Sequence, residues 1–124
     1  MNVLDNMISA VRPGGVILDL QVIRPDPRVE LNAELICEVD GRPLFAKADA
    51  ATAAIDAAIA AGHLIEEAVD DHDVRSHYLN GLDLLDDFED KTRELPAQAI
   101  PRLKTITQPI VIRERCRLRR LTVA

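Results

Sequence analysis

Two segments of this sequence carry side chains that could bind a ligand, and both are patterned like strands. The first runs from Asp70 to His77 and holds three aspartates and two histidines. Because alternate residues of a strand point the same way, Asp71, Asp73 and His77 would share one face. Carboxylate oxygens and imidazole nitrogens are ligands for divalent metals. These residues do not have the spacing of a recognised metal site, so we favour an acid-rich, solvated strand and expect no resident metal.

The second segment is the arginine-rich end of the chain. Alternation places Arg113, Arg115, Arg117 and Arg119 on one face of a final strand. Guanidinium groups in such a row could grip a phosphorylated or carboxylate ligand. We favour a second interpretation, in which they pair with the acidic stretch 66–90 in a neighbouring element, because segments of opposite charge attract. The candidate ligand residues of the two segments are Asp71, Asp73, His77, Arg113, Arg115 and Arg117.

No complete catalytic motif occurs in the sequence. Ser76 and His77 are adjacent, so in a strand they would point to opposite faces and the imidazole could not deprotonate the hydroxyl. There is no G-x-S-x-G nucleophile turn, and no glycine-rich loop between a strand and a helix for a phosphate or a cofactor. We therefore expect no catalytic residues and no cofactor, and the sequence favours a protein that is not an enzyme.

The composition limits the partners and the compartment. With 124 residues, 48% of them apolar, the chain predicts one folded domain spanning 1–124. A net charge of −6, with one tyrosine, two phenylalanines and no tryptophan, argues against nucleic-acid binding. No apolar run approaches the ~18 residues of a membrane helix, so we expect no membrane contact. Cys37 and Cys116 lie in strand-like runs without a C-x-x-C spacing, which is typical of buried thiols in a reduced, cytoplasmic protein.

The first part of the chain predicts a helix, a strand and a hairpin. Residues 2–12 have the apolar stripe of an amphipathic helix, which ends at Pro13-Gly14-Gly15, and residues 16–23 predict a mostly buried strand. Apolar residues alternate from 29 to 39, and Asp40-Gly41 then predicts a two-residue hairpin turn into a strand over 44–48 near a sheet edge. In that hairpin Leu35 and Cys37 face the core.

The second part of the chain predicts two helices, a helical turn and two long strands. Asp49 is a good N-cap for an alanine-rich helix over 50–61, which ends at Gly62. A long strand over 63–79, a short acidic helix over 82–91, one helical turn within 97–103 and a final strand over 110–123 follow. The expected fold is α+β: a mixed, largely antiparallel sheet of about five strands, with two main helices, 2–12 and 50–61, packed on it.

Three stretches of the chain resemble the C-terminal half of class I S-adenosylmethionine-dependent methyltransferases. The family's helix, PGG turn and fifth strand are matched by LDNMISAVRPGGVILDL, its sixth strand and following helix by GHLIEEAVDDHDVRSHYLNGLDLLDDF, and its seventh strand by IVIRERCRLRRLTV. The resemblance implies that the final strand lies between the strands 16–23 and 63–79, with its arginines beside Glu67, Asp71 or Asp73. The family's glycine-rich cofactor loop has no counterpart in this sequence, so no cofactor residue carries over.

These observations lead to two hypotheses of different classes. The first is a non-catalytic, methyltransferase-like half-domain that acts through self-association, as a homodimer, or through a protein partner. Its sheet would have an open edge along residues 16–23, and such edges are usually covered. The alternative is a small enzyme or ligand-binding protein, with an anion or metal site between the arginine face of the final strand and the segment from Asp70 to His77.

Overall fold

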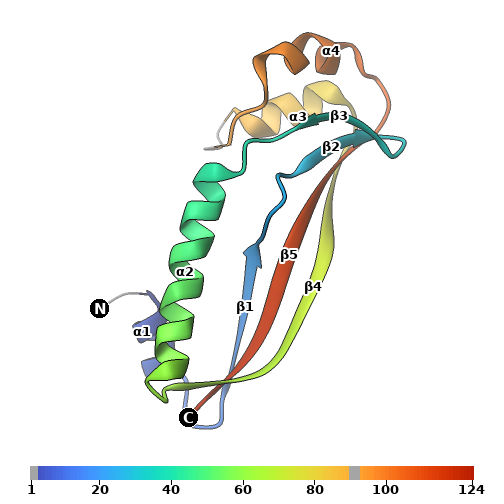
Figure 1. Cartoon of the computed structure of the whole chain (residues 1–124). Coiled ribbons are helices and arrows are strands. Elements are labelled where there is room, and N and C mark those ends of the chain that lie inside the picture. The colour runs from blue at the N-terminus through green and yellow to red at the C-terminus, as the bar shows by residue number, and fades with distance from the viewer. Residues whose placement is uncertain (1–2, 90–92) are drawn as a thin grey trace.

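The last strand of the chain, β5 (Ile110–Val123), is the centre of a five-stranded sheet (Figure 1). The computed structural model describes residues 3–89 and 93–124. The other elements, in chain order, are α1 (Val3–Ala10), β1 (Val16–Val22), β2 (Arg28–Leu31), β3 (Glu34–Glu38), α2 (Arg42–Ala60), β4 (Leu64–Tyr78), α3 (Gly81–Phe88), the 3-10 turn η1 (Ala97–Ala99) and α4 (Ile100–Thr105).

β5 has neighbours on both of its edges, and the pairings are antiparallel. One edge pairs along its length with β4. The other edge is shared by β1, which lies opposite residues 116–122, and β2, which lies opposite residues 111–113, while β3 pairs with the outer side of β2. The predicted α+β fold with five largely antiparallel strands is confirmed. The predicted place of the final strand, between the strands 16–23 and 63–79, is confirmed as well.

Two hydrophobic cores lie on opposite faces of β5, one towards each end. Ile110 and Ile112 point into a core beneath α3 and α4, whose other buried members are Val29, Val39, Leu84, Phe88, Ala99 and Leu103. Leu121 and Val123 are odd-numbered and therefore face the other way, where they pack under α2 with Ile17, Ile55 and Leu64. In Figure 1, α3 and α4 gather at one end of the long strands, and α2 runs beside β1 towards the other end.

The predicted hairpin at Asp40-Gly41 is wrong, because the chain turns at Asn32-Ala33 instead. Both residues of this turn have positive φ, 51° and 69°, as a two-residue hairpin turn of the favoured twist requires. The turn joins β2 to β3, so the alternating run 29–39 folds back on itself and does not form one strand. As a consequence Leu35 lies opposite Glu30 and is 42% exposed, and its predicted place in the core is also wrong.

Helix α2 begins earlier than the sequence predicts. It starts at Arg42 with Pro43 in its first turn, so residues 44–48 are helical and do not form the predicted edge strand. Phe45, in this added length, is buried, and its packing holds the helix start in place. Asp49 is consequently inside the helix and is not its N-cap. Its carboxylate instead lies 3.0 Å from Nη2 of Arg24.

Helical structure near residue 100 is longer than the one turn predicted within 97–103, because η1 (Ala97–Ala99) continues into α4 (Ile100–Thr105). The long strand and the acidic helix agree with their predictions. The strand predicted over 63–79 is β4, a single strand with a bulge between Glu66 and Ala68. The acidic helix is α3, which is capped by Asn80, whose Oδ1 accepts the amide of Asp83 at 2.9 Å. Residue 2 and residues 90–91, at the ends of two predicted helices, lie outside the described residues. Among the helices that the structure describes, none has the length and apolar character needed to cross a membrane.

Candidate interaction surface

The acidic strand β4 and the arginine-rich strand β5 lie side by side, and their charged side chains pair across one face of the sheet. Nε and Nη2 of Arg117 donate to the two carboxylate oxygens of Asp71 at 2.8 and 3.0 Å. Nη1 of Arg115 donates to Asp73 at 3.2 Å, and Nη1 of Arg113 reaches the same carboxylate at 3.4 Å. We call these five residues the ion-pair ladder. The predicted pairing of the basic and acidic segments is confirmed.

Hydrogen bonds from the arginines lower the pKa values of the two aspartates of the ladder. The bonds donated by Arg117 and Arg115 lower the pKa of Asp71 and of Asp73 below its usual value, and outweigh the opposite effect of burial. The side chains of both pairs stay partly exposed, so solvent screens them and they contribute little to stability. They link β4 to β5 across this face, and the guanidinium groups of Arg115 and Arg117 are already engaged by carboxylates.

Arg119 lies on the same face as the ladder but in a different environment. It is 8% exposed, and its Nε donates to Glu66 at 2.6 Å while its Nη2 donates to Asp56 of α2 at 2.9 Å. Burial alone would lower the pKa of this guanidinium, but the hydrogen bonds to the two carboxylates raise it overall, and the group stays charged. This arginine therefore ties α2 to the sheet and is not available to a ligand.

The histidines do not join the ladder. His77 is on the ladder's face, opposite Val111, but makes no hydrogen bond or ion pair with any residue that the structure describes. His72 lies on the other face, where its Nδ1 is 3.0 Å from Oδ2 of Asp70. Across residues 3–89 and 93–124, no group of three or more histidine, cysteine, aspartate or glutamate side chains is placed to hold a metal ion.

The opposite face of the sheet is apolar and exposed at the end where α2 covers the first face. Register places Val16, Leu18 and Leu20 of β1 on this side, together with Leu118 of β5 and with Ile65 and Ala68 of β4. We call these six residues the apolar face. Val16, Leu18, Leu20 and Ile65 are 44%, 63%, 54% and 51% exposed. Arg120 lies among these residues, between Leu18 and Ala68. A cluster of exposed apolar side chains on a folded chain commonly marks a binding surface.

The sequence pattern did not reveal the apolar face, because it predicts residues 16–23 as a mostly buried strand. That prediction is correct for Ile17, which is 4% exposed under α2, and wrong for Val16 and Leu18, which point the other way. A strand with apolar residues on both sides is typical of a sheet that is covered on both faces. Among the described residues β1 pairs with β5 alone, so the predicted open edge along this strand is present.

Three charged residues beside the ladder were not among the candidates: Arg28, Glu30 and Arg75. Glu30 accepts hydrogen bonds from Nε of Arg28 at 3.2 Å and from Nη2 of Arg113 at 2.9 Å. Burial alone would raise the pKa of Glu30, but these two bonds lower it overall. Alternation along β4 would have placed Arg75 on the ladder's face, whereas Arg28 and Glu30 reach it only because β2 pairs with β5.

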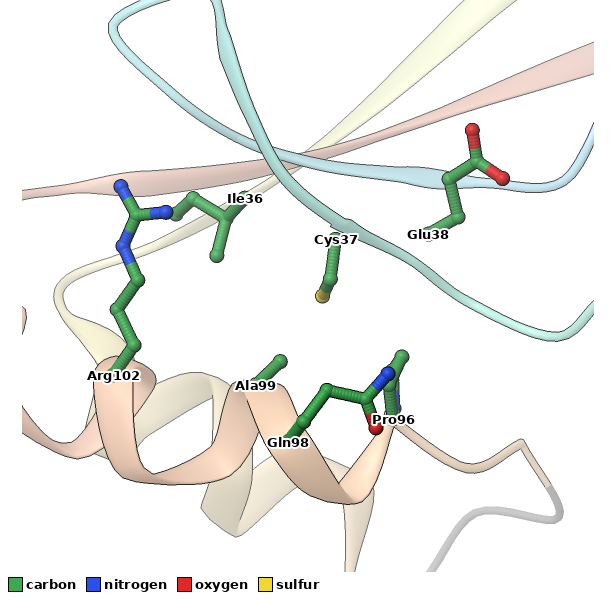
Figure 2. A pocket seen from close by; sticks show the side chains of 7 residues that line it. All are labelled: Ile36, Cys37, Glu38, Pro96, Gln98, Ala99 and Arg102. Atoms are coloured by element: carbon green, nitrogen blue, oxygen red, sulfur yellow. The ribbon is translucent and has the colours of Figure 1, made fainter.

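A pocket of about 480 Å³ lies between β3 and the η1–α4 segment (Figure 2). Its walls include Ile36, Cys37, Gln98 and Arg102, and the sulfur of Cys37 points into the space. Burial raises the pKa of this thiol above its usual value, against the weaker opposite effect of Arg102. The thiolate is the reactive form of cysteine, so this sulfur is a poor nucleophile and the pocket has no catalytic constellation.

Comparison with known protein families, with curated proteins and with solved structures finds no match for this chain. The resemblance to methyltransferases therefore stays a prediction. What the chain does has to be inferred from the two faces of its sheet, one with the ion-pair ladder and one with the apolar face.

Proposed function

We propose that this chain is a non-catalytic, methyltransferase-like half-domain that works by self-association. The apolar face carries the proposal, because one side of the sheet is packed under α2 while the other presents Val16, Leu18, Leu20 and Ile65 to solvent. Burying an exposed leucine side chain contributes about 1.5–3 kcal/mol, so several together can hold two chains in contact. The antiparallel order β1-β5-β4 is the one that the resemblance implies, and it supports the half-domain part of the proposal.

The partner that we infer is a second copy of the chain, related by a two-fold axis. Two antiparallel sheets pack face to face at about 10 Å, with their side chains interdigitated. The apolar face has one cation within it and one anion at its border, since Arg120 lies between Leu18 and Ala68, and Asp70 lies opposite Leu118. A two-fold axis brings this patch onto the same patch of the other copy. The cation of each copy can then meet the anion of the other, which suits a self-complementary interface.

Sedimentation velocity at micromolar concentrations tests the proposal. The wild-type chain is expected to sediment as a dimer. Leu18→Lys puts an ammonium group into the apolar face directly opposite Arg120 and is expected to give a monomer, because two unpaired like charges would have to be buried at the interface. Leu82→Lys is the matched control: Leu82 is 59% exposed on α3, away from the apolar face, so this variant should remain a dimer.

Two outcomes would contradict the proposal. A wild-type chain that sediments as a monomer would exclude self-association, and a partner would have to be a different protein. A Leu18→Lys variant that remains dimeric would show that another surface, such as the open edge of β1, forms the contact.

A further inference from the structure

Three arginines form a row across the neighbouring strands β2, β5 and β4. Arg28 lies directly opposite Arg113, and Arg113 lies directly opposite Arg75. Side chains that are opposite each other in an antiparallel pair are close, with Cβ atoms about 4.5–5.5 Å apart, so like charges at these positions repel. Anions near the row therefore relieve this repulsion.

Two carboxylates of the protein compensate the row in part. Glu30 is shared by Arg28 and Arg113, and Asp73 is shared by Arg113 and Arg115. Three guanidinium groups thus divide two carboxylates between them. Arg28, Arg113 and Arg115 together therefore keep one positive charge that these two carboxylates do not compensate.

Arg75 adds a second positive charge. Its side chain is exposed, and among the described residues it makes no hydrogen bond or ion pair. Nε of Arg113 is buried and also has no acceptor. Asp26 lies with Arg28 in the wall of a small neighbouring pocket and offsets at most one of the two charges, and its Oδ1 already accepts the amide of Gly41. The row keeps donors and positive charge that the protein's own acids do not satisfy.

A pocket of about 420 Å³ lies at this row. Its polar walls are Arg75, Arg113, Glu30 and Asn32, and its apolar walls include Pro109 and Val111. The volume is within the range of about 300–1,000 Å³ that small-molecule pockets occupy. Guanidinium groups bind phosphate and carboxylate groups through paired hydrogen bonds.

We propose that this pocket binds the phosphate group of a small phosphorylated molecule, with Arg75 and Arg113 as the principal donors. A phosphate monoester is a dianion near neutral pH and matches the uncompensated charge of the row. Its three terminal oxygens can accept from both guanidinium groups and from the Asn32 amide, whereas a carboxylate has two oxygens. Glu30 is the one acid in the pocket wall, and Arg28 and Arg113 already engage it. The pocket is on the face opposite the apolar face, so the inference does not rest on self-association.

Isothermal titration calorimetry with inorganic phosphate, at neutral pH and constant ionic strength, tests the site. The wild-type chain is expected to show saturable binding with one site per chain. Arg75→Gln removes a donor that no described residue uses, so the fold should persist while the affinity falls by about tenfold, as expected for the loss of one hydrogen bond to a charged group. Arg12→Gln is the matched control, because it removes the same charge from an exposed position before β1 and should leave the affinity unchanged.

A second variant distinguishes a specific phosphate site from general attraction of phosphate to positive charge. Glu30→Gln keeps the shape of the pocket wall and removes its negative charge, so phosphate should bind more tightly. Absence of saturable binding to the wild-type chain would overturn the proposal. Equal losses of affinity in Arg75→Gln and Arg12→Gln would overturn it too, because they would show a response to net charge alone.

Discussion

Arg119 of β5 and Asp56 of α2 join the second helix to the sheet, with Nη2 of the guanidinium 2.9 Å from Oδ1 of the carboxylate. The same guanidinium also binds Glu66 of β4, so one side chain connects three elements. Arg119 is 8% exposed, whereas the arginines of the ladder on the same face of β5 stay substantially exposed. Arg119 therefore differs from Arg113, Arg115 and Arg117 in its burial, although all four side chains lie on one face of β5.

Arg119→Ala is therefore expected to lower the free energy of unfolding more than Arg115→Ala. Loss of Arg119 breaks hydrogen bonds to two charged groups, and we expect a decrease of about 1–3 kcal/mol, limited because both carboxylates can be rehydrated. Loss of Arg115 breaks a solvent-screened pair and should cost ~0–1 kcal/mol. Urea denaturation of both variants measures the difference, and equal changes would contradict a structural role for Arg119.

Leu84→Ala is expected to lower the free energy of unfolding by about 2–5 kcal/mol, because truncation of a buried leucine loses apolar contacts and leaves a cavity. Leu84 is fully buried in the core beneath α3 and α4. Leu82→Ala, in the same helix, removes the same atoms from a side chain that is 59% exposed and should change stability by less than about 0.5 kcal/mol. Equal denaturant midpoints for the two variants would contradict a core role for Leu84.

Tyr78 should ionise at unusually high pH. Burial and then the hydrogen bond from its hydroxyl to Oδ2 of Asp87, at 2.7 Å, raise the pKa of Tyr78 to about 12. The chain has one tyrosine and no tryptophan, so the ultraviolet absorbance of tyrosinate reports this group alone. Asp87→Asn removes the charge that opposes ionisation and should lower the pKa. Because the folded pKa is the higher one, stability should fall as pH rises from the unfolded value of about 10 towards 12.

The chain is expected to lose stability in acid. Among the residues that the structure describes, five carboxyl groups have a pKa held below the usual value by arginines: Glu30, Asp40, Asp49, Asp71 and Asp73. A lowered folded pKa stabilises the fold above the unfolded value and loses that contribution as pH falls through the folded value. Urea melts should therefore show a decline that begins near pH 4.5, at the ordinary pKa of glutamate, and steepens below 3.8, that of aspartate.

Asp71→Asn provides the internal check on this acid dependence. The variant should be less stable than the wild-type chain at neutral pH and should show a shallower decline in acid, because the amide cannot be protonated in this range. Asp86→Asn, an exposed position on α3, should keep the wild-type slope. An unchanged slope in Asp71→Asn would mean that the ladder does not contribute to the acid dependence.

That β5 lies near the acidic segment could be predicted because charge and alternation are properties of short segments. Its place between β1 and β4 was implied by the resemblance to methyltransferases. The arginines on 113–119 and the acids on 66–90 favour neighbouring elements because opposite charges attract, and Arg117 does lie beside Asp71. The position of the hairpin turn could not be predicted in the same way, because two dipeptides in this part of the chain can form such a turn. Asp40-Gly41 is the stronger local signal, but Pro43 and Phe45 extend α2 back to Arg42, and the turn forms at Asn32-Ala33.

The two faces of the sheet show where local pattern stops being informative. Alternation correctly assigned Arg113, Arg115, Arg117 and Arg119 to one face, and with them the residues that make the ladder. Alternation did not predict which face of the sheet is buried, because the helices that bury each face come from other parts of the chain. Since α3 and α4 pack on one face at one end and α2 on the other face at the other end, the buried side of β5 changes between Cys116 and Arg119. That change buries Arg119, exposes Leu18 and leaves the row of Arg28, Arg113 and Arg75 open, and it depends on packing between segments far apart in the chain.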